Sequence, residues 1–210
     1  VYRFTGTVGQ RLIYDSWQND NNPVYVQLFN PSGAIVFING NSDDDVGPFT
    51  LTQAGTYYLA VRSLIADNTV DYKFRLIDVL QAPALPLAFD TSITGTNLPA
   101  AAASVYRFTG TNGQRLFFDF AATNTGIANV YLYGPRDQFL NGYGGNYLTT
   151  DFEQTLPADG TYILTVNNPH ADGDPNGFTN FTFRVVTPNT VTNALTLGAT
   201  VTGSLVKPGD

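Results

Sequence analysis

The sequence contains no cysteine and no methionine, and its only glutamate is Glu153. Without cysteine, the fold can have neither disulfides nor thiol chemistry. Because methionine is absent even at residue 1, we expect the chain to be a processed product or a piece of a longer protein. Runs of about 18 apolar residues are also missing, so no segment is predicted to span a membrane.

Charge is scarce as well. Charged residues make up 13% of the chain, against about 25% in an average protein, and the net charge is −7. An acidic surface without a basic stripe repels a phosphate backbone, so nucleic acid is not an expected partner. Asn, Thr, Gly and Tyr fill the polar positions, and these residues favour turns and strands. With 43% hydrophobic residues for packed cores, the composition indicates a globular all-β protein.

The chain repeats itself. VYRFTGTVGQRLIYD at 1–15 returns as VYRFTGTNGQRLFFD at 105–119. Three further blocks recur in the same order: 24–33 with 129–137, 51–61 with 156–166, and 72–79 with 181–188. Self-similarity at this spacing indicates two copies of one structural unit.

Each repeated block alternates apolar and polar residues, as a half-buried strand does. In the first block Tyr2 and Phe4 alternate with Arg3, and turn signals such as NPSG and ADG separate the blocks. Helical periodicity is absent from the sequence. The pattern predicts an all-β fold of two tandem jelly-roll-like antiparallel β-sandwich domains.

Charged residues recur with the strands. Arg3, Arg11 and Asp15 return as Arg107, Arg115 and Asp119. They alternate with the apolar positions, which places them on the predicted wet face of each strand. We expect outward cross-strand ion pairs, which require no ligand to explain them.

The motifs in these blocks resemble the bacterial pre-peptidase C-terminal (PPC) domain. They are Y-x-F at Tyr2–Phe4, G-Q-x-L at Gly9–Leu12, L-F-x-P-x-G at Leu28–Gly33, A-x-G-T-Y-x-L-x-V at Ala54–Val61 and Y-x-F-x-L at Tyr72–Leu76. The second copy departs from the pattern at Pro135–Asp137 and at Phe181, which replaces the tyrosine. These are packing and turn motifs, so they concern the fold more than an activity.

The resemblance implies a calcium-tolerant β-sandwich that is extracellular or on the cell surface and is not itself catalytic. Such domains accompany secreted proteases and collagen-binding segments, and they are arrayed in large surface proteins. In that family a strand like TSITGTN precedes the Y-x-F strand. The second copy has this strand within 84–98, the first copy lacks it, and a similar stretch follows the second copy at 194–210.

This frame predicts three parts of the chain. Residues 1–82 form a first sandwich that lacks its first strand, 83–188 form a second sandwich, and 189–210 are the first strand of a following repeat. A missing strand leaves an edge open to strand addition, so we expect copies of the chain to join head to tail. The residues expected to enter the neighbouring sandwich are Leu195, Leu197, Val201 and Leu205.

Residues suited to catalysis are few. The chain has no G-x-S-x-G and no H-E-x-x-H motif. A Ser–His–Asp triad would have to use His170, the only histidine, which lies in the polar stretch NNPHADGDPNG. Since one glutamate and turn-forming aspartates offer no clear carboxylate pair, the chain is predicted not to be an enzyme.

Metal binding, by Ca²⁺, is the best chemical candidate in the sequence. Residues 172–177 read DGDPNG, which matches the start of an EF-hand loop with Asp172, Asp174 and Asn176 as ligands. The twelfth position is Phe183 in place of the bidentate glutamate, so the full motif fails. A polar hairpin tip is the alternative for this stretch.

A second acidic stretch, SDDDV at 42–46, offers Asp43 and Asp45. Strict alternation would point these two carboxylates the same way, where an ion or solvent must offset their repulsion. The second copy has YGGNY at the matching place, so a calcium site shared by both copies is not indicated. A solvated turn is the alternative.

Three aromatic residues are candidates for stacking on sugars. Tyr143 and Tyr147 stand in the glycine-rich stretch NGYGGNY, which reads as a loop, and Trp17 opens the stretch WQNDNNP. Exposed flat rings can bind carbohydrate. The alternative is that these rings pack over the ends of the sandwiches.

Two functions remain open from the sequence. The first is a non-catalytic structural repeat of an extracellular fibre or adhesin, in which copies share strands head to tail. The alternative is a carbohydrate- or collagen-binding accessory module of a secreted hydrolase, with a glycan or a matrix protein as partner. Ordered structure in 194–206 is expected if that segment pairs with a neighbouring copy, and not if it stays free.

Overall fold

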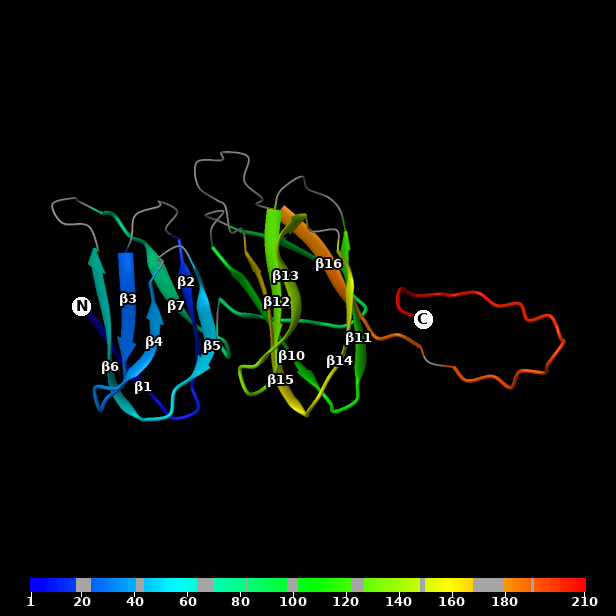
Figure 1. Cartoon of the computed structure of the whole chain (residues 1–210), viewed down its shortest axis with the longest axis horizontal. Coiled ribbons are helices and arrows are strands. Elements are labelled where there is room, and N and C mark those ends of the chain that lie inside the picture. Colours follow the sequence, from blue (N-terminus) through cyan, green and yellow to red (C-terminus); the bar gives the residue numbers. More distant parts are fainter. Residues whose placement is uncertain are drawn as a thin grey trace.

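The computed structural model describes residues 1–17, 24–40, 44–63, 70–81, 83–97, 102–121, 127–147, 150–167, 180–189 and 191–210. Strands are the regular elements of this described part, and they form two sandwiches side by side (Figure 1). The prediction of two tandem antiparallel β-sandwiches is confirmed. No helix in the described ranges has the length and apolarity that a membrane crossing requires.

The first sandwich consists of sheets A and B. Sheet A has the order β1 (Tyr2–Gly6), β6 (Gly55–Ser63), β3 (Val24–Phe29), β4 (Ile35–Asn39). Sheet B has the order β5 (Val46–Thr50), β2 (Arg11–Ser16), β7 (Phe74–Asp78). All pairings in both sheets are antiparallel.

The second sandwich consists of sheets C and D. Sheet C has the order β13 (Phe139–Tyr147), β12 (Ile127–Tyr133), β15 (Gly160–Asn167), β10 (Ser104–Gly110), β8 (Leu85–Pro86). Sheet D has the order β14 (Phe152–Thr155), β11 (Arg115–Ala121), β16 (Asn180–Val186), β9 (Ile93–Thr96). The short β8 runs parallel to β10, and the other pairings are antiparallel.

The repeated motifs build the same details in both sandwiches. In the G-T-Y motif the tyrosine is fully buried, and its hydroxyl donates to a carbonyl four residues earlier, Tyr57 to Gln53 O at 2.9 Å and Tyr162 to Ala158 O at 2.6 Å. These bonds satisfy a polar group that burial would otherwise leave unpaired. The tyrosine ring also stacks on the phenylalanine of Y-x-F, with centroids 5.4 Å apart in the first sandwich and 5.3 Å in the second.

The G-Q motif closes the first turn of each sandwich. Gly9 and Gly113 have φ angles of 81° and 80°, which only glycine adopts without strain. The side-chain oxygen of Gln10 accepts from the Thr7 amide, as that of Gln114 accepts from the Thr111 amide. The motif therefore fixes a turn, as expected from its residue types.

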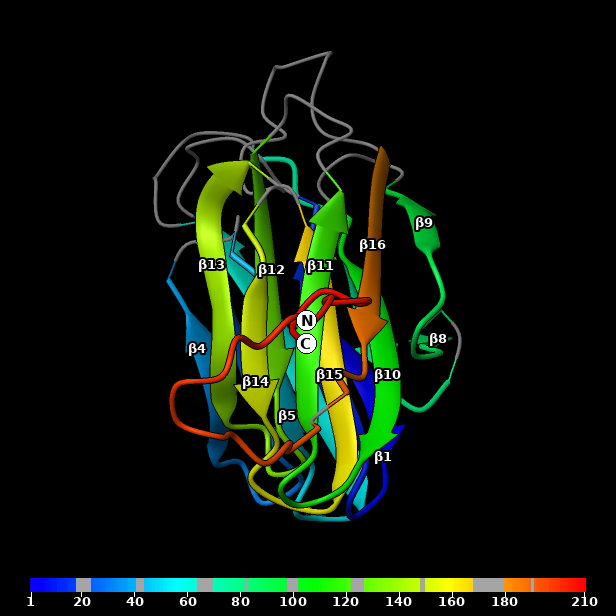
Figure 2. The same cartoon turned by 90° about the vertical axis from the view of Figure 1, so that its right-hand side faces the viewer.

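The four sheets stack in the order A, B, C, D along the longest axis of the molecule (Figure 1). One core lies between sheets A and B, and another between sheets C and D. A third apolar cluster, which includes Ile13, Ile77, Val105 and Ile163, joins sheet B to sheet C. Figure 2 looks along this axis onto the outer face of sheet D. The two sandwiches therefore share a packed boundary.

Candidate functional site

The first sandwich has no described counterpart of β8 and β9. In the second sandwich β9 pairs with β16 at the edge of sheet D, and β8 pairs with β10 at the edge of sheet C. The matching strands of the first sandwich are β7 and β1, and each is the last strand of its sheet. Both edges lie on the same side of the first sandwich, which leaves its core uncovered there.

Equivalent aromatic residues differ in exposure because of this difference. Tyr2 is 47% exposed, whereas Tyr106, at the same place in the second VYRF block, is 2% exposed. Tyr72 is 42% exposed, whereas its counterpart Phe181 is 1% exposed. Aromatic residues that are buried in the core of the second sandwich are thus exposed at the equivalent positions of the first. We call this region, formed by Tyr2, Phe4, Tyr72 and Phe74, the open edge.

The rings of the open edge contact one another. Tyr2 and Tyr72 share a hydrogen bond between their hydroxyls at 2.7 Å. Both pack against Phe74, Tyr2 edge-on with centroids 5.4 Å apart and Tyr72 stacked at 6.2 Å. The hydrogen bond to Tyr2 raises the pKa of the Tyr72 hydroxyl. The open edge is therefore an ordered apolar surface with two hydroxyls at its rim.

The second sandwich shows what covers these positions when the strands are present. The backbone of Gly95 in β9 lies directly on the aromatic rings, since a Cβ there would be 2.1 Å from Phe181 Cζ and 2.7 Å from the Tyr106 hydroxyl. Phe89 packs edge-on against Phe108, with centroids 5.4 Å apart. Only glycine allows so close an approach of a strand to the rings.

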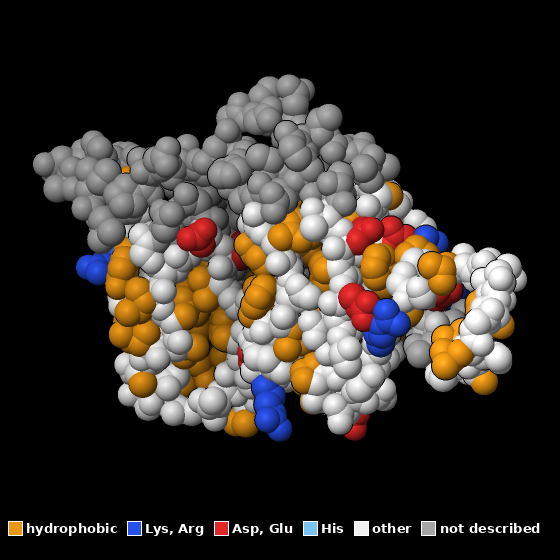
Figure 3. All heavy atoms as spheres, turned by 45° about the vertical axis from the view of Figure 1, so that its right-hand side comes forward, with side chains coloured by type: hydrophobic (Ala, Val, Ile, Leu, Met, Phe, Trp, Pro, Cys, Tyr) orange, Lys and Arg blue, Asp and Glu red, His pale blue; other side chains and the backbone are white. Residues whose placement is uncertain are grey.

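The C-terminal segment, residues 191–210, carries the predicted strand-donation residues, and they are exposed. The ordered structure expected in 194–206 is not formed within the single chain: the segment has no strand and projects from the second sandwich (Figures 1 and 3). Its exposed apolar side chains are Val191, Leu195, Leu197, Val201, Leu205 and Val206. The segment also contains Gly203, around which nothing lies within 4 Å of an added Cβ.

The last residues of the segment are held against the second sandwich. Asn189 N, just before the segment, donates to Asp210 Oδ1 at 2.7 Å and so joins its two ends, and Lys207 Nζ lies 3.0 Å from Asp90 Oδ1 of the second sandwich. A Cβ on Gly209 would lie 2.9 Å from Cβ of Phe117 in sheet D. The middle of the segment therefore projects into solvent between its two ends, away from residues 1–80 of its own chain (Figure 1).

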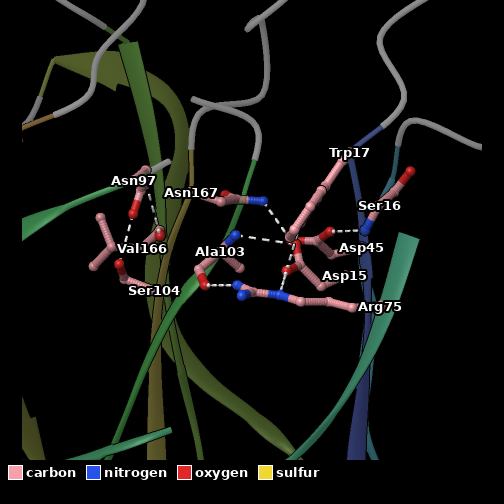
Figure 4. A network of polar contacts seen from close by, with 10 residues as sticks. All are labelled: Asp15, Ser16, Trp17, Asp45, Arg75, Asn97, Ala103, Ser104, Val166 and Asn167. Atoms are coloured by element: carbon pink, nitrogen blue, oxygen red, sulfur yellow. Dashed lines mark hydrogen bonds and ion pairs between the residues drawn. The ribbon is translucent and has the colours of Figure 1, made fainter. Parts of the chain in front are cut away.

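A buried polar network joins the two sandwiches (Figure 4). Asp15 is fully buried and accepts from Ala103 N and from Trp17 Nε1, both at 3.0 Å, and it pairs with Arg75. Arg75 also donates to Ala103 O at 2.8 Å. Burial raises the pKa of Asp15, and the Arg75 charge acts in the opposite direction.

Asp45 belongs to the same network. It accepts from Ser16 N at 2.9 Å and from Asn167 Nδ2 at 2.6 Å, so it also links the two sandwiches. Burial raises the pKa of Asp45 well above its usual value, and the nearby Asp15 charge adds to the effect. The Oδ1 atom of Asn167 is buried without a hydrogen-bond partner among the described residues.

Arg11 crosses the boundary between the sandwiches. Its guanidinium contacts Asp137 Oδ1 at 2.7 Å, Thr161 O at 2.9 Å and Gly134 O at 3.0 Å. The expectation that Arg11 lies in an outward ion pair on a wet surface is wrong, because the face of β2 that carries it packs against sheet C. Alternation marks two faces of a strand but does not say that the second face meets another domain.

The expected outward cross-strand ion pairs are present in the second sandwich, where Asp119 pairs with Arg184 on the outer face of sheet D and Arg115 pairs with Glu153 at the surface. In the first sandwich Asp15 also pairs across the sheet, with Arg75, but this pair lies in the buried boundary.

The predicted calcium ligands fall largely outside the described residues. Asp172, Asp174 and Asn176 lie there, as does Asp43. Within the described ranges no three His, Asp or Glu side chains come together as metal ligands, and Asp45 already accepts two hydrogen bonds. Calcium therefore stays a prediction.

Two of the predicted sugar-binding rings are placed in the structure. Tyr143 is not on an exposed loop as expected: it lies in β13, packs against the second core and meets Phe120 edge-on at 6.1 Å. Burial raises the pKa of its hydroxyl, which has no described partner. Trp17 is half-buried beside Lys73 and Arg75. The side chain of Tyr147 lies outside the described part.

Comparison with known proteins finds no family model and no curated protein that matches the chain. A pre-peptidase C-terminal domain of a collagenase from Bacillus anthracis is a similar solved structure, with 18% identity and a TM-score of 0.37 over 49% of this chain and 93% of that one. PliG from Aeromonas hydrophila, a periplasmic inhibitor of g-type lysozyme, has 18% identity and a TM-score of 0.36 over 49% and 93%.

The secreted serine protease VesC from Vibrio cholerae matches 87% of this chain and 46% of its own, with 14% identity and a TM-score of 0.33. At such values a likeness says nothing of what the chain binds or does. The PPC-like β-sandwich that the motifs predict is confirmed as a fold by the two-sheet architecture of each half of the chain.

Proposed function

We propose that this chain is a non-catalytic structural repeat of an extracellular fibre or adhesin. In this proposal the C-terminal segment of one copy lies on the open edge of the next and supplies the two strands that the first sandwich lacks. The observation that carries it is the contrast between equivalent aromatic residues, exposed at Tyr2 and Tyr72 and buried at Tyr106 and Phe181. These aromatic residues are buried in the second sandwich because β8 and β9 cover them. The first sandwich would bury its equivalent residues in the same way if two such strands were added to it.

The C-terminal segment is similar in sequence to residues 84–96, which contain β8 and β9. VTGS at 201–204 corresponds to ITGT at 93–96, and ALTL at 194–197 corresponds to ALPL at 84–87. Gly203 then takes the place of Gly95, whose backbone lies on the rings. Val201 and Leu197 take the places of Ile93 and Leu87, which pack against the second core. Burying each such side chain contributes about 1.5–3 kcal/mol.

The arrangement of the molecule supports a head-to-tail order. The open edge belongs to the first sandwich, and the C-terminal segment projects from the second sandwich on the side away from the first (Figure 1). A contact between two different surfaces of identical units does not close on itself, so it builds a filament. Strand addition of this kind uses main-chain hydrogen bonds for affinity and side-chain positions for register.

An extracellular or cell-surface location is part of the proposal. It follows from the resemblance of the motifs to PPC domains, and calcium in 172–177 would belong to the same setting. The partner proposed here is a further copy of the chain, and a glycan or matrix protein remains the alternative that the sequence leaves open.

The test is sedimentation velocity and electron microscopy of the purified chain over a range of concentrations. The unmodified chain should associate into fibres, and Val201→Asp should prevent it because a charge would enter the apolar edge. Thr202→Asp is the matched control, since its counterpart Thr94 points outward to Thr182, and it should still associate. A chain that stays monomeric, or two variants that behave alike, would overturn the proposal.

A further inference from the structure

We infer that the outer face of sheet D is a docking surface for the outer face of sheet A of a second copy. The contact would repeat the one that sheet B makes with sheet C inside the chain. This docking rests on the head-to-tail order of the proposed function. It uses residues outside the C-terminal segment and the open edge, so an experiment can contradict the docking without contradicting strand sharing, and the reverse.

The contact between sheets B and C is the template. Ile13 and Ile77 of sheet B meet Val105 and Ile163 of sheet C in the third apolar cluster. Arg11 hydrogen-bonds to main-chain oxygens of the second sandwich, and Asn167 bonds to Asp45. Apolar residues in the middle and charged residues around them are the composition of a stable protein interface.

The outer face of sheet D carries the residues that form the sheet B side of this template. Arg115, Phe117, Asp119, Arg184 and Val186 stand where sheet B has Arg11, Ile13, Asp15, Arg75 and Ile77. These positions point away from the core of the second sandwich. Part of the face is already covered within the single chain, because Val186 is buried and Gly209 lies on Phe117.

The outer face of sheet A carries the other side. Val1 and Tyr58 stand where sheet C has Val105 and Ile163. Tyr58 is 45% exposed and Val1 is exposed, whereas Ile163 has no exposed surface and Val105 is buried. Large apolar side chains that are buried in one copy of the repeat are thus left in solvent in the other.

The charges on the two faces are complementary. Asp151 accepts from Phe120 N at 2.8 Å as Asp45 accepts from Ser16 N, so Asp151 is the counterpart of Asp45. The counterpart of Asn167 is Arg62, which now lies over the Tyr25 ring at 4.3 Å. The contact inside the chain has the Asp45–Asn167 hydrogen bond at this place. The docked contact would have an ion pair there instead, between Asp151 of one copy and Arg62 of the next.

The end of the chain already lies where the template requires it. Ala103, two residues before Val105, belongs to the same cluster as Ile13. Gly209 lies on Phe117, the counterpart of Ile13. In Figure 2, which looks along the stacking axis, the N and C marks lie next to each other, although in Figure 1 the N mark lies beside the first sandwich and the C mark on the far side of the second. A second copy moved along this axis would bring its β1 to the end of the C-terminal segment.

Charge reversal tests the docking with the C-terminal segment intact. Arg62→Asp and Asp151→Arg should each weaken association, measured by sedimentation velocity, about tenfold or more, and the double variant should regain most of the loss because the pair is restored with its signs exchanged. Asp159→Arg is the control. It makes the same change of charge on the turn before β15, outside the outer faces of sheets A and D, and this variant should associate as the unmodified chain does.

The outcomes separate this inference from strand sharing. If Arg62→Asp and Asp151→Arg associate normally while Val201→Asp does not, the docking of sheet D on sheet A is wrong and strand sharing stands. If the charge variants lose association and the double variant regains it while Val201→Asp has no effect, docking stands and strand sharing is wrong. Loss in both single variants without recovery in the double variant, or no association of the unmodified chain, overturns the docking.

Discussion

The two sandwiches share their first turn, their stacked aromatic pair and their buried tyrosine, yet they differ at one side. In the second sandwich β8 and β9 cover the aromatic rings, and in the first the equivalent rings form the open edge. The repeated motifs therefore define the fold of each unit without completing it. Completion depends on a segment outside the most strongly repeated blocks, and this segment appears again at 194–204.

The difference between the two sandwiches is tested most directly by removing one equivalent aromatic ring from each. Phe181→Ala should lower the free energy of unfolding by about 3–5 kcal/mol, because it leaves a cavity in a closed core. Tyr72→Ala should cost about 1 kcal/mol in dilute monomer, because much of that ring is already in water. Urea unfolding of both variants measures the difference. Equal losses would mean that the open edge is closed in solution.

Arg11 and its counterpart Arg115 offer a second comparison. Arg11→Ala should destabilise the chain by about 2–4 kcal/mol, since it removes three hydrogen bonds and leaves Asp137 without its cation. Arg115→Ala should have a much smaller effect on the monomer, because the pair with Glu153 is exposed and water screens it. Thermal unfolding at low concentration compares them. A large effect of Arg115→Ala would show that its face is already buried.

Glycines at matched positions give a third, smaller effect. Gly95→Val should destabilise the second sandwich by about 1–3 kcal/mol, since a side chain there collides with Phe181 and Tyr106. Gly203→Val should leave monomer stability unchanged, because space around Gly203 is open. Denaturant unfolding checks both. The comparison fails if Gly203→Val destabilises the isolated chain as much as Gly95→Val does.

The smallest expected effect is the dependence of stability on pH. Asp45 has a raised pKa in the folded chain, so between the unfolded value near 4 and the raised value the folded state binds more protons than the unfolded state. Stability should therefore fall as pH rises through this window, in which the charges of Asp15 and Asp44 also act on Asp45. Asp45→Asn should flatten that fall in unfolding measurements from pH 4 to 7. An unchanged slope in Asp45→Asn would place the titration on another group and would contradict this account of the boundary between the sandwiches.

The sequence predicts the strands and the tandem order well, because alternation and turn residues are local signals. It does not predict the burial of Arg11 and Asp15, since a strand face that packs on another domain has the same period as one in water. The stretch with Tyr143 reads as a loop because of its glycines, yet it forms β13. A Cβ on Gly142 would lie 2.1 Å from Val130 O, so glycine is needed for the irregular pairing of β12 and β13 there.

The short strand β9 has a mechanical consequence. Tension along the stacking axis enters the second sandwich before β8 and leaves it after β16. Since β9 and β16 are antiparallel and Ile93 lies opposite Phe183, both strands are pulled from the same end. Their hydrogen bonds would then break one after another, as in a zipper, and not all at once in shear. Single-molecule pulling on the two chain ends should therefore release β8 and β9 at low force while the rest of the second sandwich holds, and a single high-force rupture would contradict this reading.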